Sequence, residues 1–131
     1  MAIKVAVISL GCAKNLVDSE VMLGILSRSD FQVVEEPREA EVIVVNTCGF
    51  IAAAKEESVN MILEMARFKE TGQCKALIVT GCLAQKYREE LLAELPELDA
   101  ITGTGDIDKI AEIAWRALEG ERVDQVNLPK Y

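Results

Sequence analysis

The sequence predicts an α/β fold of three layers, in which helices cover both faces of a mostly parallel sheet of five or six strands. Half of the 131 residues are hydrophobic and only 5% are aromatic, which is typical of a core of Val, Ile, Leu and Ala. Several apolar runs are continuous, as in strands that are buried on both faces. These runs alternate with helical patterns, and that order implies parallel strands joined by helical crossovers.

Six segments have the character of strands, three of them strongly. The strong runs are Ile3–Leu10, Glu41–Asn46 and Lys75–Thr80. Weaker strands are predicted at Phe31–Glu35, around Asp99–Ile101 and at Arg122–Val126.

Helical patterns, with apolar residues at the spacing of one helix face, lie between these strands. They cover Asn15–Arg28, Ala52–Lys69, Leu83–Leu95 and Ile107–Leu118. Asn15 with Asp18 resembles a capping box at the start of the first helix. Leu63 belongs to the apolar stripe of the second helix, Pro96 ends the third, and Gly120 ends the last.

Right-handed crossovers leave few topologies for these elements. The flavodoxin-like strand order 2-1-3-4-5 places the three strong strands together at the centre of the sheet, so we predict this order. No internal linker is apparent, and we expect one domain over residues 1–122. The polar tail 123–131 is expected to begin a linker to a further domain.

The charge of the chain limits its partners. The formal net charge is −8 and there is no histidine. An acidic domain does not create the positive field that nucleic-acid backbones require, so we expect no direct nucleic-acid binding, whereas a basic protein partner suits the charge. No stretch approaches the roughly 20 apolar residues that span a bilayer. We therefore expect a cytoplasmic protein without membrane contact, in which thiols stay reduced.

Three of the four cysteines follow the strong strands. Cys12, Cys48 and Cys82 each come shortly after a strand and before a helix, and each has a glycine beside it. Parallel strands lie about 4.8 Å apart and end at the same edge, so three adjacent strands can direct three loops toward one small cofactor. Thiolates bind metals, and helix N-termini lower thiol pKa values. We therefore predict these cysteines as metal ligands. Candidates for hydrogen bonds around them are Asn15, Asn46, Thr47 and Thr80.

Cys74 precedes the strand that Cys82 follows. An extended strand would separate the two residues by about 25 Å, at ~3.3 Å per residue. Cys74 is therefore excluded as a ligand.

The residues alone leave the metal open. Structural zinc usually takes four protein ligands, whereas a 4Fe–4S cluster held by three thiolates keeps one iron open, so we favour iron over zinc. Two other interpretations are that the cysteines are small buried residues and that Cys12 and Cys48 form a disulfide. A disulfide would leave Cys82 unpaired and fits the cytosol poorly.

Other functions of this fold suit the chain less well. A phosphorelay receiver needs acidic residues where Cys12 and Cys48 stand, and a flavodoxin needs a hydroxyl-rich phosphate loop after its first strand. A cobalamin-binding module would need a ligating histidine. No GxGxxG fingerprint for a dinucleotide follows any strand.

Three motifs resemble the amino-terminal domain of radical S-adenosylmethionine (SAM) methylthiotransferases, over nearly the whole chain. They are SLGCAKNLVDSE (Ser9–Glu20), VNTCGFIAAAKEES (Val45–Ser58) and VTGCLAQKY (Val79–Tyr87), and GTGD (Gly103–Asp106) extends the match. The resemblance implies that Cys12, Cys48 and Cys82 bind an auxiliary 4Fe–4S cluster that presents the transferred sulfur. It assigns no catalytic acid or base to this chain.

The motif SLGCAKNLVDSE is similar to the RimO-like branch, which methylthiolates an aspartate of a small-subunit ribosomal protein. That protein is the implied substrate, and the transfer-RNA branch is the alternative. The family also uses a CxxxCxxC triad, for a second 4Fe–4S cluster and S-adenosylmethionine, that this sequence lacks. We therefore expect a radical SAM domain beyond the tail and no turnover by this chain alone. A non-catalytic cluster or metal carrier, or a redox-sensing module, is the other alternative.

Overall fold

The computed structural model describes residues 3–10, 13–47, 52–81, 84 and 87–125. In this part of the chain, six strands form one sheet in which every neighbouring pair is parallel. Their order is β2-β1-β3-β4-β5-β6, so the predicted order is confirmed and β6 extends it at one edge. The strands are β1 (Ile3–Ser9), β2 (Phe31–Val33), β3 (Val42–Thr47), β4 (Ala76–Gly81), β5 (Ala100–Thr102) and β6 (Val123–Gln125).

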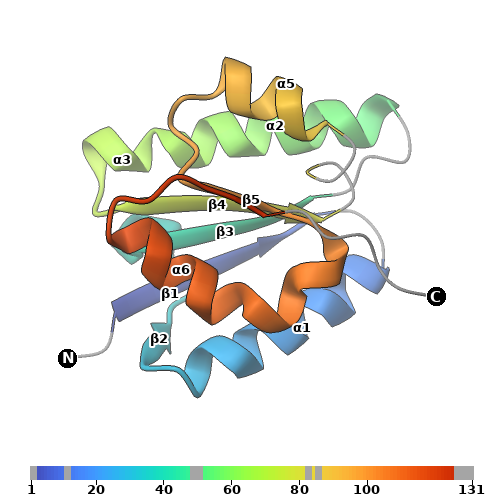
Figure 1. The fold of residues 1–131 in the computed structure, drawn as a ribbon. Coiled ribbons are helices and arrows are strands. Elements are labelled where there is room, and N and C mark those ends of the chain that lie inside the picture. Colours follow the sequence, from blue (N-terminus) through green and yellow to red (C-terminus); the bar gives the residue numbers. More distant parts are fainter. Residues whose placement is uncertain (1–2, 11–12, 48–51, 82–83, 85–86, 126–131) are drawn as a thin grey trace.

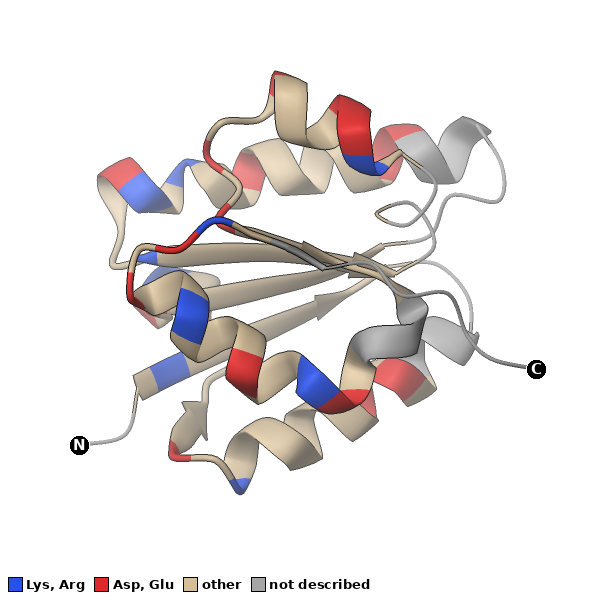
Figure 2. Cartoon of the chain, viewed as in Figure 1, with Lys and Arg blue, Asp and Glu red and all other residues tan. Residues whose placement is uncertain are grey.

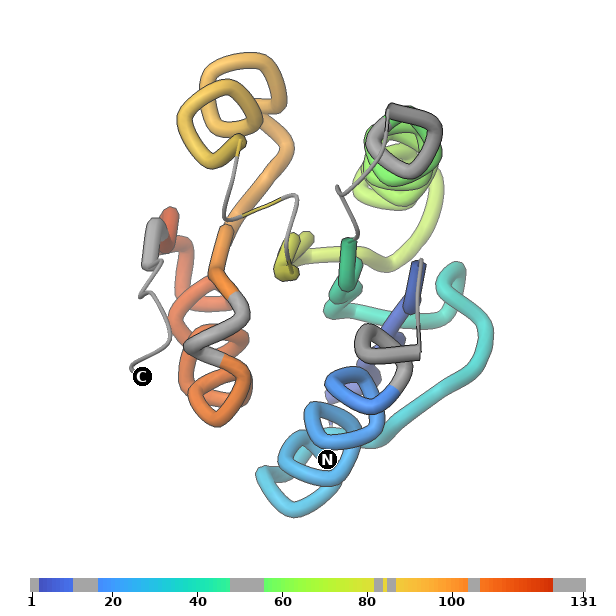
Figure 3. The backbone as a smooth tube through the Cα atoms, turned by 90° about the vertical axis from the view of Figure 1, so that its right-hand side faces the viewer, coloured from blue at the N-terminus to red at the C-terminus, as the bar shows by residue number. Residues whose placement is uncertain are grey.

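Helices cover both faces of the sheet and complete the predicted three layers (Figures 1 and 3). The helices on one face are α1 (Ala13–Ser27) and α6 (Ile110–Leu118). Those on the other face are α2 (Ala52–Ala66), α3 (Phe68–Thr71) and α5 (Arg88–Glu94). Two 3-10 turns connect elements: η1 (Pro37–Glu39) and η2 (Thr104–Lys109).

Each face of the sheet has its own hydrophobic core, and β3 contributes to both. Alternate residues of a strand point to opposite faces. Val42 and Val44 pack with Met22 and Leu26 of α1, whereas Ile43 and Val45 pack with residues of α2 and α5. Because β3 and β4 are buried on both sides, they have the continuous apolar character that identifies them in the sequence.

Two expectations for the first two helices were wrong. Helix α1 begins at Ala13, so Asn15 lies inside the helix and cannot cap it, because a capping residue needs a non-helical backbone. Helix α2 turns Ile62, Met65 and Ala66 into the core, and this orientation leaves Leu63 45% exposed instead of in the apolar stripe.

The helix predicted at Leu83–Leu95 is interrupted at Tyr87, whereas Ala84 is helical. Tyr87 has φ −114° and ψ 29°, which is not helical, and α5 starts at Arg88. The last helix starts at Ile110 because the preceding residues form the 3-10 turn η2. Gly120 follows it with a positive φ of 97°, as expected for a glycine that ends a helix.

Candidate functional site

The carboxyl ends of β1, β3 and β4 lie side by side at one edge of the sheet. Ser9 of β1 pairs with Asn46 of β3, and Asn46 pairs with Thr80 of β4. Beyond Ser9, the amide of Leu10 donates a hydrogen bond of 3.0 Å to the carbonyl oxygen of Asn46. One more step along the central pair, Thr47 is the partner of Gly81. The three strong strands therefore end together, as the predicted site requires.

The predicted ligands Cys12, Cys48 and Cys82 lie outside the described residues. In the sequence, Cys48 directly follows Thr47 and Cys82 directly follows Gly81. Among the residues that the structure describes, no group of three or more His, Cys, Asp or Glu could hold a metal ion. The three-cysteine ligand set thus stays a prediction.

The hydroxyl of Thr47 connects the ends of β3 and β4. It donates a hydrogen bond of 2.7 Å to the carbonyl oxygen of Thr80, and it accepts one of 3.4 Å from the amide of Ala84. Thr80 and Ala84 stand on either side of Cys82 in the sequence. The buried side chain of Thr47, which directly precedes Cys48, therefore holds the residues on both sides of Cys82.

Gly81 allows the two strand ends to approach closely. Its φ is +102°, a backbone conformation that residues other than glycine rarely adopt. A Cβ atom at this position would collide with the carbonyl oxygen of Thr47 and would lie only 2.7 Å from Oδ1 of Asn46. The edge is thus a backbone cradle that a larger residue would fill.

A set of buried polar side chains lies beneath this edge. Nδ2 of Asn46 donates a hydrogen bond of 3.0 Å to Oγ of Ser19 on α1. Thr80 and Thr102, each the last or next-to-last residue of its strand, are also buried. Within the described part of the chain, Oγ1 of Thr102 has no hydrogen-bond partner. Asn46, Thr47 and Thr80 were candidates from the sequence.

Sequence reasoning missed Ser19 and Thr102. Ser19 had a detectable signal, because it precedes Met22 and Leu26 at the spacing of one helix face and is therefore a polar residue in an apolar stripe. Thr102 directly precedes the GTGD motif. The side chain of Asn15, another candidate, lies outside the described residues.

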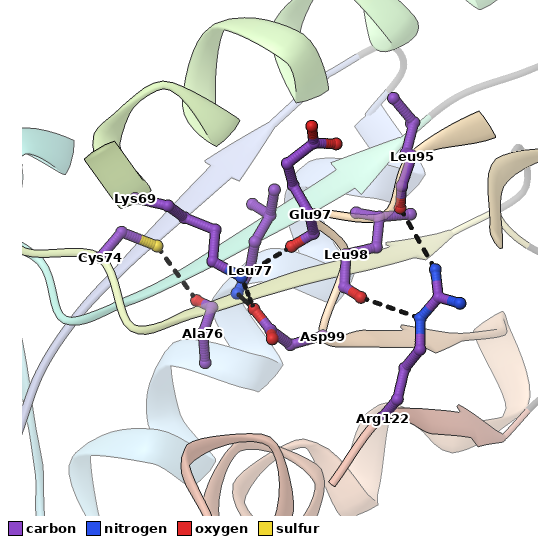
Figure 4. Close-up of polar contacts among 9 residues, drawn as sticks. All are labelled: Lys69, Cys74, Ala76, Leu77, Leu95, Glu97, Leu98, Asp99 and Arg122. Atoms are coloured by element: carbon purple, nitrogen blue, oxygen red, sulfur yellow. Dashed lines mark hydrogen bonds and ion pairs between the residues drawn. The ribbon is translucent and has the colours of Figure 1, made fainter. Parts of the chain in front are cut away.

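Cys74 lies at the opposite edge, before β4 begins (Figure 4). Its side chain is 5% exposed, and the thiol donates to the carbonyl oxygen of Ala76 over 3.4 Å. Burial raises the pKa of this thiol from 9.0 to about 11. Nearby, Lys69 forms an ion pair with Asp99. Cys74 is therefore a neutral, poorly reactive core residue, far along the strand from the predicted site.

Comparison with known proteins identifies related sequences. Residues 4–103 match an uncharacterized protein family, UPF0004. The chain is 51% identical over 131 residues to "Ribosomal protein uS12 methylthiotransferase RimO" of Pelotomaculum thermopropionicum, an alignment that covers all of the chain and 30% of that protein. It is 57% identical over 121 residues to the protein of the same name from Lachnoclostridium phytofermentans, covering 92% of the chain and 28% of that protein.

A third similar relative, from Acetivibrio thermocellus and with the same name, is 57% identical over 110 residues, which are 84% of the chain and 24% of that protein. The chain thus spans about a quarter to a third of the length of the curated relatives it matches. In the part of the chain that the structure describes, no helix is long and apolar enough to span a membrane.

Proposed function

Since the chain belongs to the UPF0004 family and is RimO-like throughout, we propose that it is the cluster-binding domain of a methylthiotransferase. In this proposal, Cys12, Cys48 and Cys82 hold one 4Fe–4S cluster. The longer protein that contains the domain binds a second cluster and S-adenosylmethionine elsewhere, and it methylthiolates an aspartate of ribosomal protein uS12.

The observation that carries the proposal is the convergence of three strand ends. The bond from Leu10 to Asn46 joins β1 to β3, and the hydroxyl of Thr47 joins β3 to both flanks of Cys82. Segments that are far apart in the sequence are thereby fixed at one edge, where ligands bind in open α/β sheets. This arrangement supports a single cofactor held by three loops.

The residues at this edge suit a cluster in their chemistry. When bound, a cluster held by three thiolates supplies one iron with a coordination position open to sulfur. Helix α1 begins directly after Cys12, and a helix N-terminus stabilises a thiolate. The close approach at Gly81 leaves backbone groups near the site, and the buried hydroxyls and amide around Asn46 hold the strand ends rigid.

Anaerobic reconstitution with iron and sulfide tests the ligand set. We expect about four irons per chain, in a 4Fe–4S cluster identified by Mössbauer spectroscopy. Each of Cys12→Ala, Cys48→Ala and Cys82→Ala should abolish stable incorporation, and Cys74→Ala, the matched control, should retain it. Stoichiometric zinc without iron uptake, or loss of the cluster in Cys74→Ala, would contradict the proposal.

The substrate is tested in a longer protein. We would replace the matching segment of the Pelotomaculum thermopropionicum relative with this chain and analyse ribosomal protein uS12 by mass spectrometry. A methylthio group on one aspartate is expected, and the Cys12→Ala version of the chimera should give none. Methylthiolated transfer RNA with unmodified uS12 would assign the domain to the transfer-RNA branch.

A further inference from the structure

A groove lies between α2 and α5. Both helices lie on the face of the sheet opposite α1 (Figures 1 and 3). Its volume is about 530 Å³. Leu63 and Val59 of α2 form one wall, and Leu91 and Leu95 belong to the other. Tyr87, five residues after Cys82 in the sequence, also lines the groove.

Aliphatic side chains make up most of the lining of this groove, which is open to solvent. Leu91 and Leu95 are buried members of the core, and Val59 packs against that core. Leu63 is 45% exposed in the middle of an otherwise amphipathic helix. A second hollow, of about 120 Å³, is lined by Leu63 and Ala66 of α2 and by the charged residues Arg67, Glu70 and Glu97. The two hollows share Leu63, and the apolar lining belongs mainly to the larger one.

Acidic side chains border the groove. Glu90 and Glu94 both line it, one helical turn apart on α5. Figure 2 shows acidic positions on this helix in red. Among the described residues, no cation forms an ion pair with either carboxylate. The nearby Lys69 is engaged by Asp99 and by the carbonyl oxygen of Glu97.

These two glutamates are unfavourable for the helix that carries them. Like charges four residues apart repel each other. Glu94 is also the last residue of α5, whose last turn contains no basic residue of its own. The guanidinium of Arg122 donates hydrogen bonds to the carbonyl oxygens of Leu92 and Leu95 at this helix end. The two carboxylates repel each other beside the groove, and this position suits a cationic ligand.

We propose that the groove binds a basic amphipathic segment of a partner protein. Apolar side chains at helical spacing would fill the space beside Leu63 and Leu91, and Lys or Arg side chains would pair with Glu90 and Glu94. The same carboxylates repel a phosphate backbone. With a net charge of −8, a second copy of the chain is also a poor occupant.

The proposal is tested with the 131-residue chain and a synthetic helical peptide that carries leucines on one face and lysines on the other. In a ¹⁵N NMR titration, the shift changes should concentrate in α2 and α5. Leu63→Ser should weaken binding by about tenfold. Glu90→Gln combined with Glu94→Gln should weaken binding and reduce its dependence on salt.

Matched controls lie on the other face of the sheet. Val21 of α1 is 49% exposed, so Val21→Ser makes the same kind of change as Leu63→Ser. Glu112→Gln with Glu119→Gln removes the same two charges near α6. The proposal is overturned if these controls weaken binding as much as the groove variants, or if the shifts spread evenly over both faces. Dimerisation that Leu63→Ser abolishes would likewise overturn it, by assigning the groove to a second copy.

Discussion

At the end of β4, the backbone of Gly81 has a φ of +102° and lies against the end of β3. Gly120 also has a positive φ, of 97°, but a Cβ atom there would meet nothing within 4 Å. Alanine substitutions at the two glycines therefore separate two contributions to the free energy of unfolding. One comes from the backbone conformation and the other from a steric collision.

We expect Gly81→Ala to destabilise the chain by about 1–3 kcal/mol more than Gly120→Ala, because only the former adds a collision with Thr47 and Asn46. Urea unfolding of the two variants and the parent, followed by circular dichroism, measures the difference. Equal losses would mean that the strand ends separate easily and that the edge is not a rigid cradle.

Cys74 is expected to resist alkylation in the folded chain. Its pKa of about 11, against 9.0 for an ordinary thiol, reduces the reactive thiolate at pH 8 by about a hundredfold. Iodoacetamide labelling followed by peptide mass spectrometry measures the rate at this one site. The urea-unfolded chain is the control, and equal rates in both states would contradict the burial.

The same thiol makes stability depend on pH. Its pKa is higher in the folded than in the unfolded chain, so the folded state holds the proton more tightly. The contribution of this thiol to the free energy of unfolding is fully present below about pH 9 and is lost as the pH rises toward about 11. Cys74→Ala should flatten the decline of the unfolding midpoint in this range. An unchanged decline would assign it to other groups.

Some single residues could be predicted and others could not. Cys74 could be placed away from the site because strand length alone separates it from Cys82. Leu63 could not be recognised as exposed, because a helical stripe shows which residues share a face but not how the helix rotates against the sheet. The hydroxyl of Thr47 was a candidate, yet its two partners depend on the register between β3 and β4.

Among the elements, the junction of α3, β4 and β5 is held by one carboxylate (Figure 4). Oδ2 of Asp99 accepts hydrogen bonds from Nζ of Lys69, at 2.5 Å, and from the amide of Leu77, at 2.9 Å. Lys69 also donates to the carbonyl oxygen of Glu97. These contacts draw α3 toward the sheet.

Asp99→Ala should therefore cost about 1–3 kcal/mol of unfolding free energy, because the amide of Leu77 loses a partner. Asp99→Asn, which keeps an acceptor, should cost less. Glu41→Gln is the control, since Lys75 is 3.9 Å away and largely exposed, and we expect it to change stability by less than about 0.5 kcal/mol. Equal effects of Asp99→Ala and Glu41→Gln in urea unfolding would refute this role.

The same junction explains why one helix was expected where two occur. The apolar pattern from Ala52 to Lys69 is continuous, but the chain tightens at Arg67, whose amide bonds to Glu64, three residues back. Lys69 is directed to Asp99, thirty residues away. A pattern of neighbouring residues cannot reveal such a distant partner. The apolar run of a buried strand is itself a pattern of neighbouring residues, so the strands could be predicted to within a few residues.

At the scale of the whole molecule, strand order was predictable because crossover handedness leaves few choices and the strongest apolar runs belong at the centre. The convergence of β1, β3 and β4 follows from that order. The apolar groove between α2 and α5 does not follow from the strand order, because it depends on the distance between two helices on the sheet.

The two cores extend well beyond the carboxyl edge, which contributes Leu10 and Ala84 to one of them. Both are built from side chains of the strands and helices, and the only described cysteine in them is Cys74. Hydrophobic burial of this kind is the main source of folding free energy. The domain should therefore fold before any metal binds, unlike small domains that depend on zinc.

We accordingly expect the triple variant Cys12→Ala, Cys48→Ala and Cys82→Ala to unfold cooperatively and to keep the circular dichroism of the parent. A bound cluster should raise the unfolding temperature of the parent but not of the triple variant, because a ligand stabilises only the state that binds it. Ile78→Ala, at a fully buried position in β4, should cost about 2–5 kcal/mol in both backgrounds. If the triple variant is unfolded while Ile78→Ala is tolerated, stability resides in the metal site and the two-core account fails.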